Sequence, residues 1–160
     1  MEPLALYIHW PFCAAKCPYC DFNSHVRDRV DHALWQRALL ADMRHEAELA
    51  GGEPLESVFF GGGTPSLWAP EQVARVLAAL DAAYPRTADA EVTLEANPGS
   101  FELGKFRDFE SAGVNRLSLG IQSFDSTMLR ALGRVHDGDE ALRAAAAAVQ
   151  IFPRVNLNLM

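Results

Sequence analysis

The sequence predicts an α/β fold in which parallel strands with outer helices form part of a (β/α) barrel. Strand and helix patterns alternate along the chain, with five strands and about five helices, which is typical of βαβ units in a parallel sheet. Four of the strands alternate polar with apolar residues, whereas parallel strands covered on both faces are continuous apolar runs. A curved sheet, with helices on one face and a polar concave face, accounts for both observations.

The first half of the chain contains two strands and two long helices. Residues 4–10 alternate as a strand does, and a helix runs from a candidate N-cap at Asp31 to about Ala50. A short buried strand at 57–60 ends in a run of glycines, and the next helix begins at Pro70, a favoured first helical residue. These elements form the first two strand–helix pairs.

The second half repeats this alternation with shorter elements. Period-two alternation marks its strands, and glycines end two of its helices. The expected elements are a strand at 91–96, a helix at about 101–112, a strand at 115–121, a short helix from Asp125, a helix at 138–151 and a strand at 155–159.

The polar positions of the strands share one face of the predicted sheet. They are Tyr7, His9, Thr93, Glu95, Ser118, Gly120, Gln122, Asn156 and Asn158. Any single one could be an ordinary buried polar residue with its hydrogen bonds satisfied. Together they predict a polar lumen that holds a polar ligand.

Length and composition indicate one globular domain over residues 1–160. Nearly half of the residues are apolar, and the net charge of −7 argues against nucleic acid as a partner, which requires a basic surface. No apolar run is long enough to span a membrane, and Met1–Pro3 lacks the basic start of a signal peptide. Together with the cysteine usage, these features favour a reducing cytoplasm.

All three cysteines lie in one short segment, spaced C-x3-C-x2-C at Cys13, Cys17 and Cys20. Three thiolates can hold an iron–sulfur cluster while leaving one iron open for another ligand. A structural zinc site completed by His9 or His25 is one alternative, and buried inert thiols are another. An odd cysteine count does not suit a disulfide framework.

Four features fall at the carboxyl ends of predicted strands, where parallel α/β sheets bind ligands. They are the cysteine segment, Gly61-Gly62-Gly63-Thr64, Glu95-Ala96-Asn97-Pro98 and Gln122-Ser123-Phe124. The glycine run is not a P-loop, because no G-K-[ST] follows it. It is either a tight turn or a place where the backbone approaches a ligand closely.

Several side chains at this edge have the chemistry to bind a polar group of a ligand. Glu95 and the carbonyls of the glycine run could accept from an ammonium group, and Gln122 suits the hydroxyls of a ribose. Arg134 offers a forked cation for a carboxylate, or is a solvated arginine at a helix end. Tyr7 and Tyr19 flank the cysteine segment and could equally be aromatic packing.

The sequence resembles the radical S-adenosylmethionine (SAM) superfamily and, within it, the oxygen-independent coproporphyrinogen III oxidase-like family. The C-x3-C-x2-C spacing is the superfamily signature, and further motifs occur in the family's order over nearly all 160 residues. These motifs are Tyr7-Ile8-His9-Trp10-Pro11-Phe12-Cys13, residues 17–25, Phe60-Gly61-Gly62-Gly63-Thr64-Pro65-Ser66, Glu95-Ala96-Asn97-Pro98, residues 112–116 and Gly120-Ile121-Gln122-Ser123-Phe124.

The resemblance implies a 4Fe–4S cluster on the three cysteines and SAM chelated to its open iron. An electron from the cluster would then cleave the carbon–sulfur bond of SAM and generate a 5′-deoxyadenosyl radical. The residues implied to contact SAM are Tyr7, Tyr19, Gly62, Gly63, Thr64, Glu95, Gln122, Arg134 and Asn158.

Two features favour the haem-chaperone branch of this family over its decarboxylase branch. The decarboxylases carry another cysteine at the position of Phe22, and they have a long extension before the first strand, which here begins at Leu4. The resemblance therefore implies delivery of haem to respiratory enzymes, with an electron donor as a further partner. Oxidative decarboxylation of coproporphyrinogen III is the alternative within the family, and turnover of SAM stays open.

The chain departs from the family pattern in two ways. Asn158 stands where the family commonly has aspartate, so this position has a hydrogen-bonding carbonyl but no charge. Family members are more than twice as long, and they complete a (β/α)6 barrel and add a C-terminal domain. We therefore expect residues 1–160 to be the N-terminal part of the radical SAM core, with an exposed apolar edge at 155–160.

Overall fold

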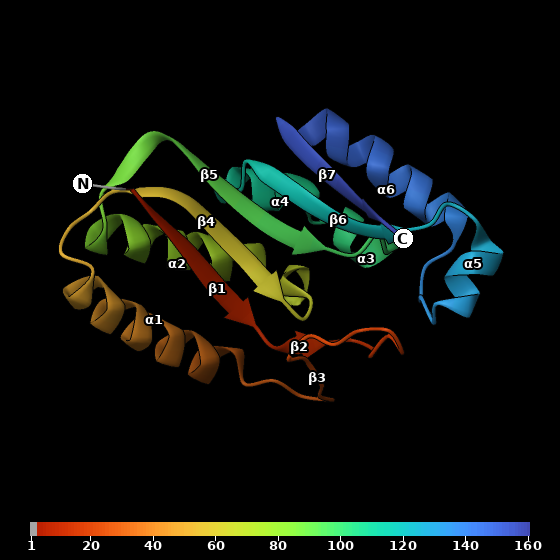
Figure 1. The fold of residues 1–160 in the computed structure, drawn as a ribbon, viewed down its shortest axis with the longest axis horizontal. Helices are drawn as coiled ribbons and strands as arrows, with labels where there is room; N and C mark the ends of the chain where they lie inside the picture. The colour runs from red at the N-terminus through yellow and green to blue at the C-terminus, as the bar shows by residue number, and fades with distance from the viewer. Residues whose placement is uncertain (1–2) are drawn as a thin grey trace.

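The computed structural model describes residues 3–160 and confirms an α/β fold built on a parallel sheet (Figure 1). Met1 and Glu2, which belong to the start Met1–Pro3 that lacks the basic residues of a signal peptide, lie outside the described residues. The five strands of the sheet are β1 (Leu4–Trp10), β4 (Leu55–Gly62), β5 (Arg86–Ala96), β6 (Arg116–Gln122) and β7 (Arg154–Leu159).

The strands stand side by side in chain order, β1-β4-β5-β6-β7, and every neighbouring pair is parallel. In a doubly wound sheet, the order in which strands are added switches from one edge of the sheet to the other. A (β/α) barrel instead adds each new strand to the same edge. Figure 1 shows the helices gathered on one face of the sheet, which leaves the other face free. This arrangement is the partial barrel expected from the strand patterns.

In residues 3–160, six α-helices and one 3-10 turn connect the strands. They are α1 (His32–Leu49), η1 (Pro65–Leu67), α2 (Pro70–Ala83), α3 (Ser100–Leu103), α4 (Phe106–Ser111), α5 (Ser126–Ala131) and α6 (Gly138–Ile151). Asp31 caps α1 as predicted, because its carboxylate accepts from the Leu34 amide at 2.8 Å. Asp137 and Glu140 form a reciprocal capping box at the start of α6.

The apolar side chains of the strands pack against the helices and form one continuous core. Val58, Leu94 and Leu117 have no exposed surface, and the helix residues Val76 and Phe109 are equally buried. Burying a side chain of this size contributes about 1.5–3 kcal/mol. The helix-covered face of the sheet therefore supplies most of the stability, and the opposite face is free to be polar.

The structure corrects several expected boundaries. The single helix expected at about 101–112 is two short helices, α3 and α4, because the chain breaks at Gly104 and Lys105. The strands β4 and β5 begin at Leu55 and Arg86, earlier than the predicted starts at residues 57 and 91. A small parallel ladder between β2 (Phe12–Cys13) and β3 (His25–Val26) was not predicted.

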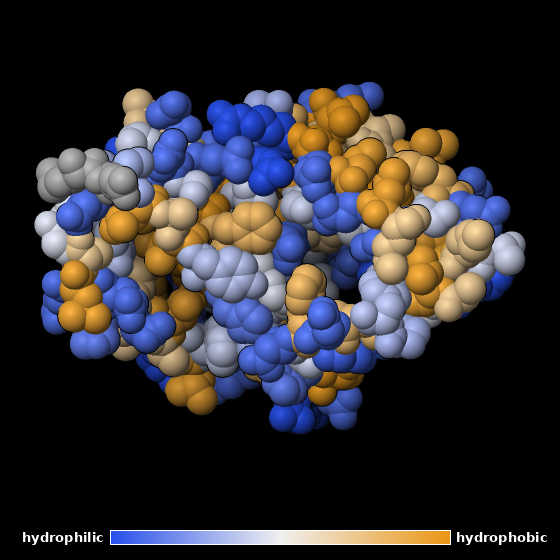
Figure 2. All heavy atoms as spheres, viewed as in Figure 1, coloured by the Kyte–Doolittle hydropathy of each residue, from blue (hydrophilic) through white to orange (hydrophobic). Residues whose placement is uncertain are grey.

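The outer edge of β7 is exposed and apolar, as expected from the sequence. Leu159 and Met160 expose 59% and 72% of their surfaces, and Figure 2 shows hydrophobic side chains along β7. An unpaired edge of this kind can recruit another strand.

Within residues 3–160, no helix is both long and apolar enough to cross a membrane.

Candidate functional site

An open polar cavity lies at the carboxyl ends of the strands, and its empty space is about 680 Å³ when its mouth is included. The cysteine segment forms one wall, and the ends of β4 to β7 form the others. Eleven of the twelve predicted site residues line it, namely Cys13, Cys17, Tyr19, Cys20, Gly62, Gly63, Thr64, Glu95, Gln122, Arg134 and Asn158. We refer to this cavity as the strand-end pocket.

The three cysteines share this pocket as free, half-buried thiols. A turn between Cys17 and Cys20, closed by a 3.1 Å backbone hydrogen bond, places both on the same loop. The Lys16 ammonium donates to the Phe22 and Ser24 carbonyls and to the Ser24 hydroxyl at 3.0 to 3.2 Å. Lys16 therefore ties the two ends of the cysteine loop together.

The glycine run brings the end of β4 against the cysteine loop. The Gly63 amide donates to the Trp10 carbonyl at 2.6 Å, and the Thr64 amide donates to the Phe12 carbonyl at 2.8 Å. A Cβ on Gly63 would lie 2.6 Å from the Phe12 carbonyl oxygen, a distance that real Cβ atoms essentially never show. The backbone of the glycine run therefore lies directly against the backbone of the cysteine loop, and the run also forms part of the pocket wall.

Glu95 lies on β5, lines the pocket and is partly buried. Its Oε2 accepts from the Gly62 amide at 3.1 Å, and within residues 3–160 it makes no salt bridge. Burial raises the pKa of Glu95, while the Gly62 amide and the nearby His9 partly oppose this shift. A partly buried carboxylate without a counter-ion suits a ligand that brings an ammonium group.

Arg134 joins several parts of the pocket and does not project into solvent. Its Nη1 donates to Cys17 Sγ and to the Tyr19 hydroxyl, both at 3.3 Å. Its Nη2 donates to Asn97 Oδ1 at 2.6 Å and to the Gly120 carbonyl at 2.8 Å. Its Nε is buried and has no hydrogen-bond partner among the described residues, so the guanidinium keeps a free donor.

Asn97 is a pocket residue that belongs to the predicted Glu95-Ala96-Asn97-Pro98 feature but is not among the predicted contact residues. Its amide nitrogen donates to Thr64 Oγ1 at 3.2 Å, and Thr64 in turn donates to Cys13 Sγ at 3.5 Å. Because Asn97 also accepts from Arg134, these side chains form a hydrogen-bonded path between Cys13 and Cys17. Its position directly after a predicted strand was the signal that could have identified it.

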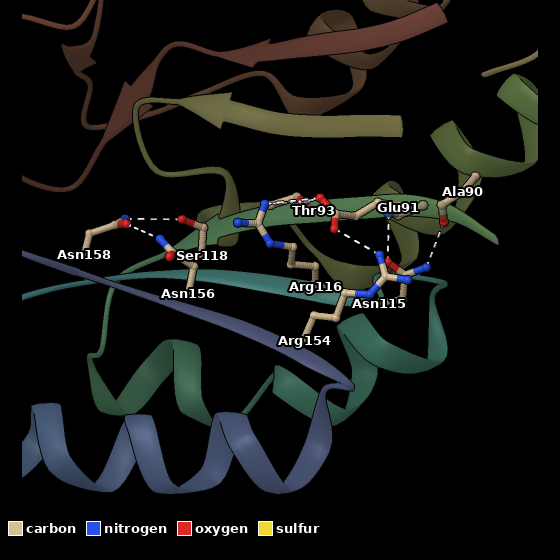
Figure 3. Close-up of polar contacts among 10 residues, drawn as sticks. Ala90, Glu91, Thr93, Asn115, Arg116, Ser118, Arg154, Asn156 and Asn158 are labelled. Carbon is tan, nitrogen blue, oxygen red and sulfur yellow. Dashed lines mark hydrogen bonds and ion pairs between the residues drawn. The ribbon is translucent and has the colours of Figure 1, made fainter. Parts of the chain in front are cut away.

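Asn158 lines the pocket, and neighbouring side chains engage its amide (Figure 3). Its nitrogen donates to Ser118 Oγ at 3.2 Å, and its oxygen accepts from the amide of Asn156. All three residues lie on the concave face of β6 and β7. The departure from aspartate thus produces a ladder of neutral hydrogen bonds along this wall.

The concave face continues below the pocket as a charged cluster around Glu91 (Figure 3). Arg116 and Arg154 pair with its two oxygens at 3.2 and 3.0 Å. Burial alone would raise the pKa of Glu91, but the two arginines and the Thr93 hydroxyl together lower it. This cluster confirms that the predicted lumen is polar over several layers of side chains.

The two tyrosines occupy different places. Tyr19 lies in the pocket beside Arg134, whereas Tyr7 is not among the lining residues. The Tyr7 ring is 56% exposed and stacks on Phe59, and burial of its hydroxyl together with Glu95 raises its pKa. The Tyr7 hydroxyl is 3.4 Å from His9 Nδ1.

His9, a candidate zinc ligand, already has a partner at each ring nitrogen. The Tyr7 hydroxyl is close to Nδ1, and Nε2 is 3.0 Å from the Asn23 carbonyl.

The donor set fits the cofactors implied by the resemblance. Three thiols face a pocket that is also lined by Glu95, a carboxylate without a counter-ion, by Arg134 and by the backbone of glycines. Among the described residues, no group of three His, Cys, Asp or Glu side chains is already arranged to hold a single metal ion. Fold and site together define a partial (β/α) barrel with a cysteine-lined pocket at the carboxyl ends of its strands.

The chain belongs to the Radical SAM superfamily, whose family profile matches residues 7–160. It is 49% identical over 157 residues to bovine (Bos taurus) radical S-adenosyl methionine domain-containing protein 1, mitochondrial, a match that covers 98% of this chain and 36% of the relative. It is 46% identical over 162 residues to the haem chaperone HemW of Escherichia coli, covering all of this chain and 43% of the relative.

A solved structure supports the same family. Coproporphyrinogen III oxidase (HemN) from Escherichia coli, described as a radical SAM enzyme, superposes with a TM-score of 0.86 at 31% identity. The match covers 98% of this chain and 37% of that chain. This chain thus spans about two fifths of the length of the proteins that it matches.

Proposed function

We propose that this chain is the N-terminal part of a HemW-like haem chaperone that holds a 4Fe–4S cluster and SAM in the strand-end pocket. The observation that carries the proposal is the convergence of three free thiols, Glu95 and Arg134 on one open cavity. Thiolates are the usual ligands of iron–sulfur clusters, and the two charged side chains complement the ammonium and carboxylate of an amino acid.

Each residue has a role in this proposal. Cys13, Cys17 and Cys20 would ligate three irons of the cluster. Glu95 and the Gly62 backbone would accept from the SAM ammonium, and Arg134 would donate to its carboxylate. When both cofactors are bound, they supply the electron transfer that cleaves the carbon–sulfur bond of SAM. The remaining proposed contacts to SAM are Tyr7, Tyr19, Gly63, Thr64, Gln122 and Asn158.

Haem delivery to respiratory enzymes is the part of the proposal that concerns the whole protein. The 46% identity to a haem chaperone supports it, as does Phe22, which occupies the position of a further cysteine in the decarboxylase pattern. An electron donor and haem or a porphyrin are the proposed partners. A reducing cytoplasm is the proposed location, because the three thiols are free.

Metal analysis tests the cofactor assignment. After anaerobic reconstitution, we expect about four irons and four sulfides per chain, because three cysteines can hold a 4Fe–4S cluster. Cys17→Ala should lose most of this iron, whereas Ala14→Ser, an exposed change within the same loop, should retain it. Bound zinc without sulfide would replace the proposal with a structural zinc domain, and full iron in Cys17→Ala would refute the ligand assignment.

Haem binding separates the two functions within the family. The structural match to coproporphyrinogen III oxidase favours decarboxylation as the second candidate. We expect the full-length protein to bind haem and to release no carbon dioxide from coproporphyrinogen III in the presence of SAM and a reductant. Release of carbon dioxide, with no haem binding, would establish the decarboxylase function instead.

A further inference from the structure

His136 is a buried titratable side chain outside the strand-end pocket. It lies between α5 and α6, and only 4% of its surface is exposed. Its Nε2 is 3.0 Å from the Ile121 carbonyl oxygen, and its Nδ1 is buried without a hydrogen-bond partner in the described part of the chain. Burial lowers the pKa of His136, and Arg134 adds to this shift, so the neutral ring is favoured.

The carbonyl that His136 contacts belongs to a strained turn. Gln122, at the end of β6, is the one non-glycine residue with a positive φ in the described chain, at 66°. The Ser123 amide donates to the Ile121 carbonyl at 2.9 Å and closes a three-residue turn around Gln122. Such γ-turns with a positive central φ are rare and strained, and the surrounding structure must hold them.

This turn determines where the Gln122 amide lies. The pairing between β6 and β7 shifts register between Leu119 and Gln122, so Gln122 no longer follows the regular strand. Its Nε2 stands 3.5 Å from the position that a Cβ on Gly120 would occupy, and Arg134 Nη2 is equally close to that position. The side chain therefore lies over Gly120, beside Arg134, in the pocket wall.

We propose that His136 is a positioning residue, which donates from Nε2 to the Ile121 carbonyl and holds the γ-turn that directs Gln122 into the pocket. A neutral imidazole has one N–H, and placing it on Nε2 accounts for both observations, the 3.0 Å contact and the unpartnered Nδ1. The inference rests on the proposed function only in taking Gln122 as a contact to SAM.

NMR of the full chain without cofactors tests the turn directly. We expect the wild-type His136 ring to be the neutral Nε2–H tautomer, hydrogen-bonded to a carbonyl. His136→Gln keeps an N–H donor at a similar reach and should preserve the positive φ of Gln122, whereas His136→Leu should lose it. A wild-type Nδ1–H tautomer, or a positive φ that persists in folded His136→Leu, would overturn the inference.

SAM affinity of the cluster-loaded chain gives an independent measurement. His136→Leu should weaken binding about tenfold, the loss of one hydrogen bond, and His136→Gln should restore it. In a Gln122→Ala background, His136→Leu should cause no further loss, because both changes remove the same contact. Additive losses would overturn the positioning role.

Failure of the proposed function can be told apart from failure of this inference. A wild-type chain that takes up the cluster but not SAM would refute the proposed function, and the NMR result would still decide the role of His136.

Discussion

Replacing Gly63 with alanine should disrupt the junction between the glycine run and the cysteine loop. The added Cβ would lie 2.6 Å from the Phe12 carbonyl oxygen and 2.9 Å from both its carbonyl carbon and its amide nitrogen. All three are backbone atoms, so relief requires that one chain segment move away from the other. Such a movement weakens the bonds from Gly63 to Trp10 and from Thr64 to Phe12.

The cost of this substitution follows from overpacking in a buried junction. Inserting one methyl group where the backbone must shift costs about 1–3 kcal/mol. Gly63 does not have a positive φ, so none of this cost comes from backbone strain at the glycine itself. Urea denaturation should show a lower midpoint with an unchanged slope. Iron uptake should fall as well, because Cys13 directly follows the displaced Phe12.

Gly61→Ala is a matched control two residues earlier. It also lacks a positive φ, and its Cβ would lie 2.8 Å from ring atoms of Phe59 and Tyr7. Those rings belong to side chains, and the exposed Tyr7 ring can rotate away, so we expect a cost below about 1 kcal/mol. Equal losses of stability and iron in both variants would refute the steric argument.

Three further predictions concern charge and hydrogen bonding. Burial raises the pKa of Glu95 above its ordinary 4.5, so the folded chain binds this proton more tightly and stability falls as pH rises above that value. Glu95→Gln should flatten this part of a urea-midpoint curve against pH, and an unchanged curve would contradict it. Asp137→Ala removes the cap of α6 and should cost about 1 kcal/mol in urea denaturation, whereas no loss would show that the capping box contributes nothing. Lys16→Met removes three hydrogen bonds within the cysteine loop, so amide exchange measured by mass spectrometry should accelerate over residues 16–24 and not in α2. Unchanged exchange in the loop would refute that role.

Local sequence signals predicted much of the fold. Asp31 and Pro70 mark helix starts that the structure confirms, and α6 has the predicted bounds because a capping acid and a proline flank its alanine-rich run. Alternation located four strands of the sheet, and a short buried apolar run ended by glycines located the fifth, β4. The polar positions of the alternating strands also predicted which face would be concave. Polar side chains are unfavourable in the core beneath the helices, so they mark the opposite face of the sheet.

The remainder depends on contacts between distant segments, which local patterns do not encode. Asn97 is a site residue through Arg134 and Thr64, each more than thirty residues away, and its own sequence position shows only the end of a strand. At Gln122, contacts from the distant His136 to the Ile121 carbonyl and from the Met160 amide to the Gln122 carbonyl accompany a positive φ that non-glycine residues rarely adopt. The break at Gly104 leaves no mark in the apolar pattern, because helical spacing continues on either side of it.

The strand-end pocket draws its wall from nearly the whole length of the chain, from Cys13 to Asn158. No short segment can create it, so the pocket comes into being only once the last strand has docked. A molecule that binds there contacts both the cysteine segment and the last strand, so its binding energy stabilises the folded arrangement of these distant parts of the chain. Thermal melting should therefore register occupancy of the pocket even with probes far from it, such as Tyr84 at the opposite end of α2.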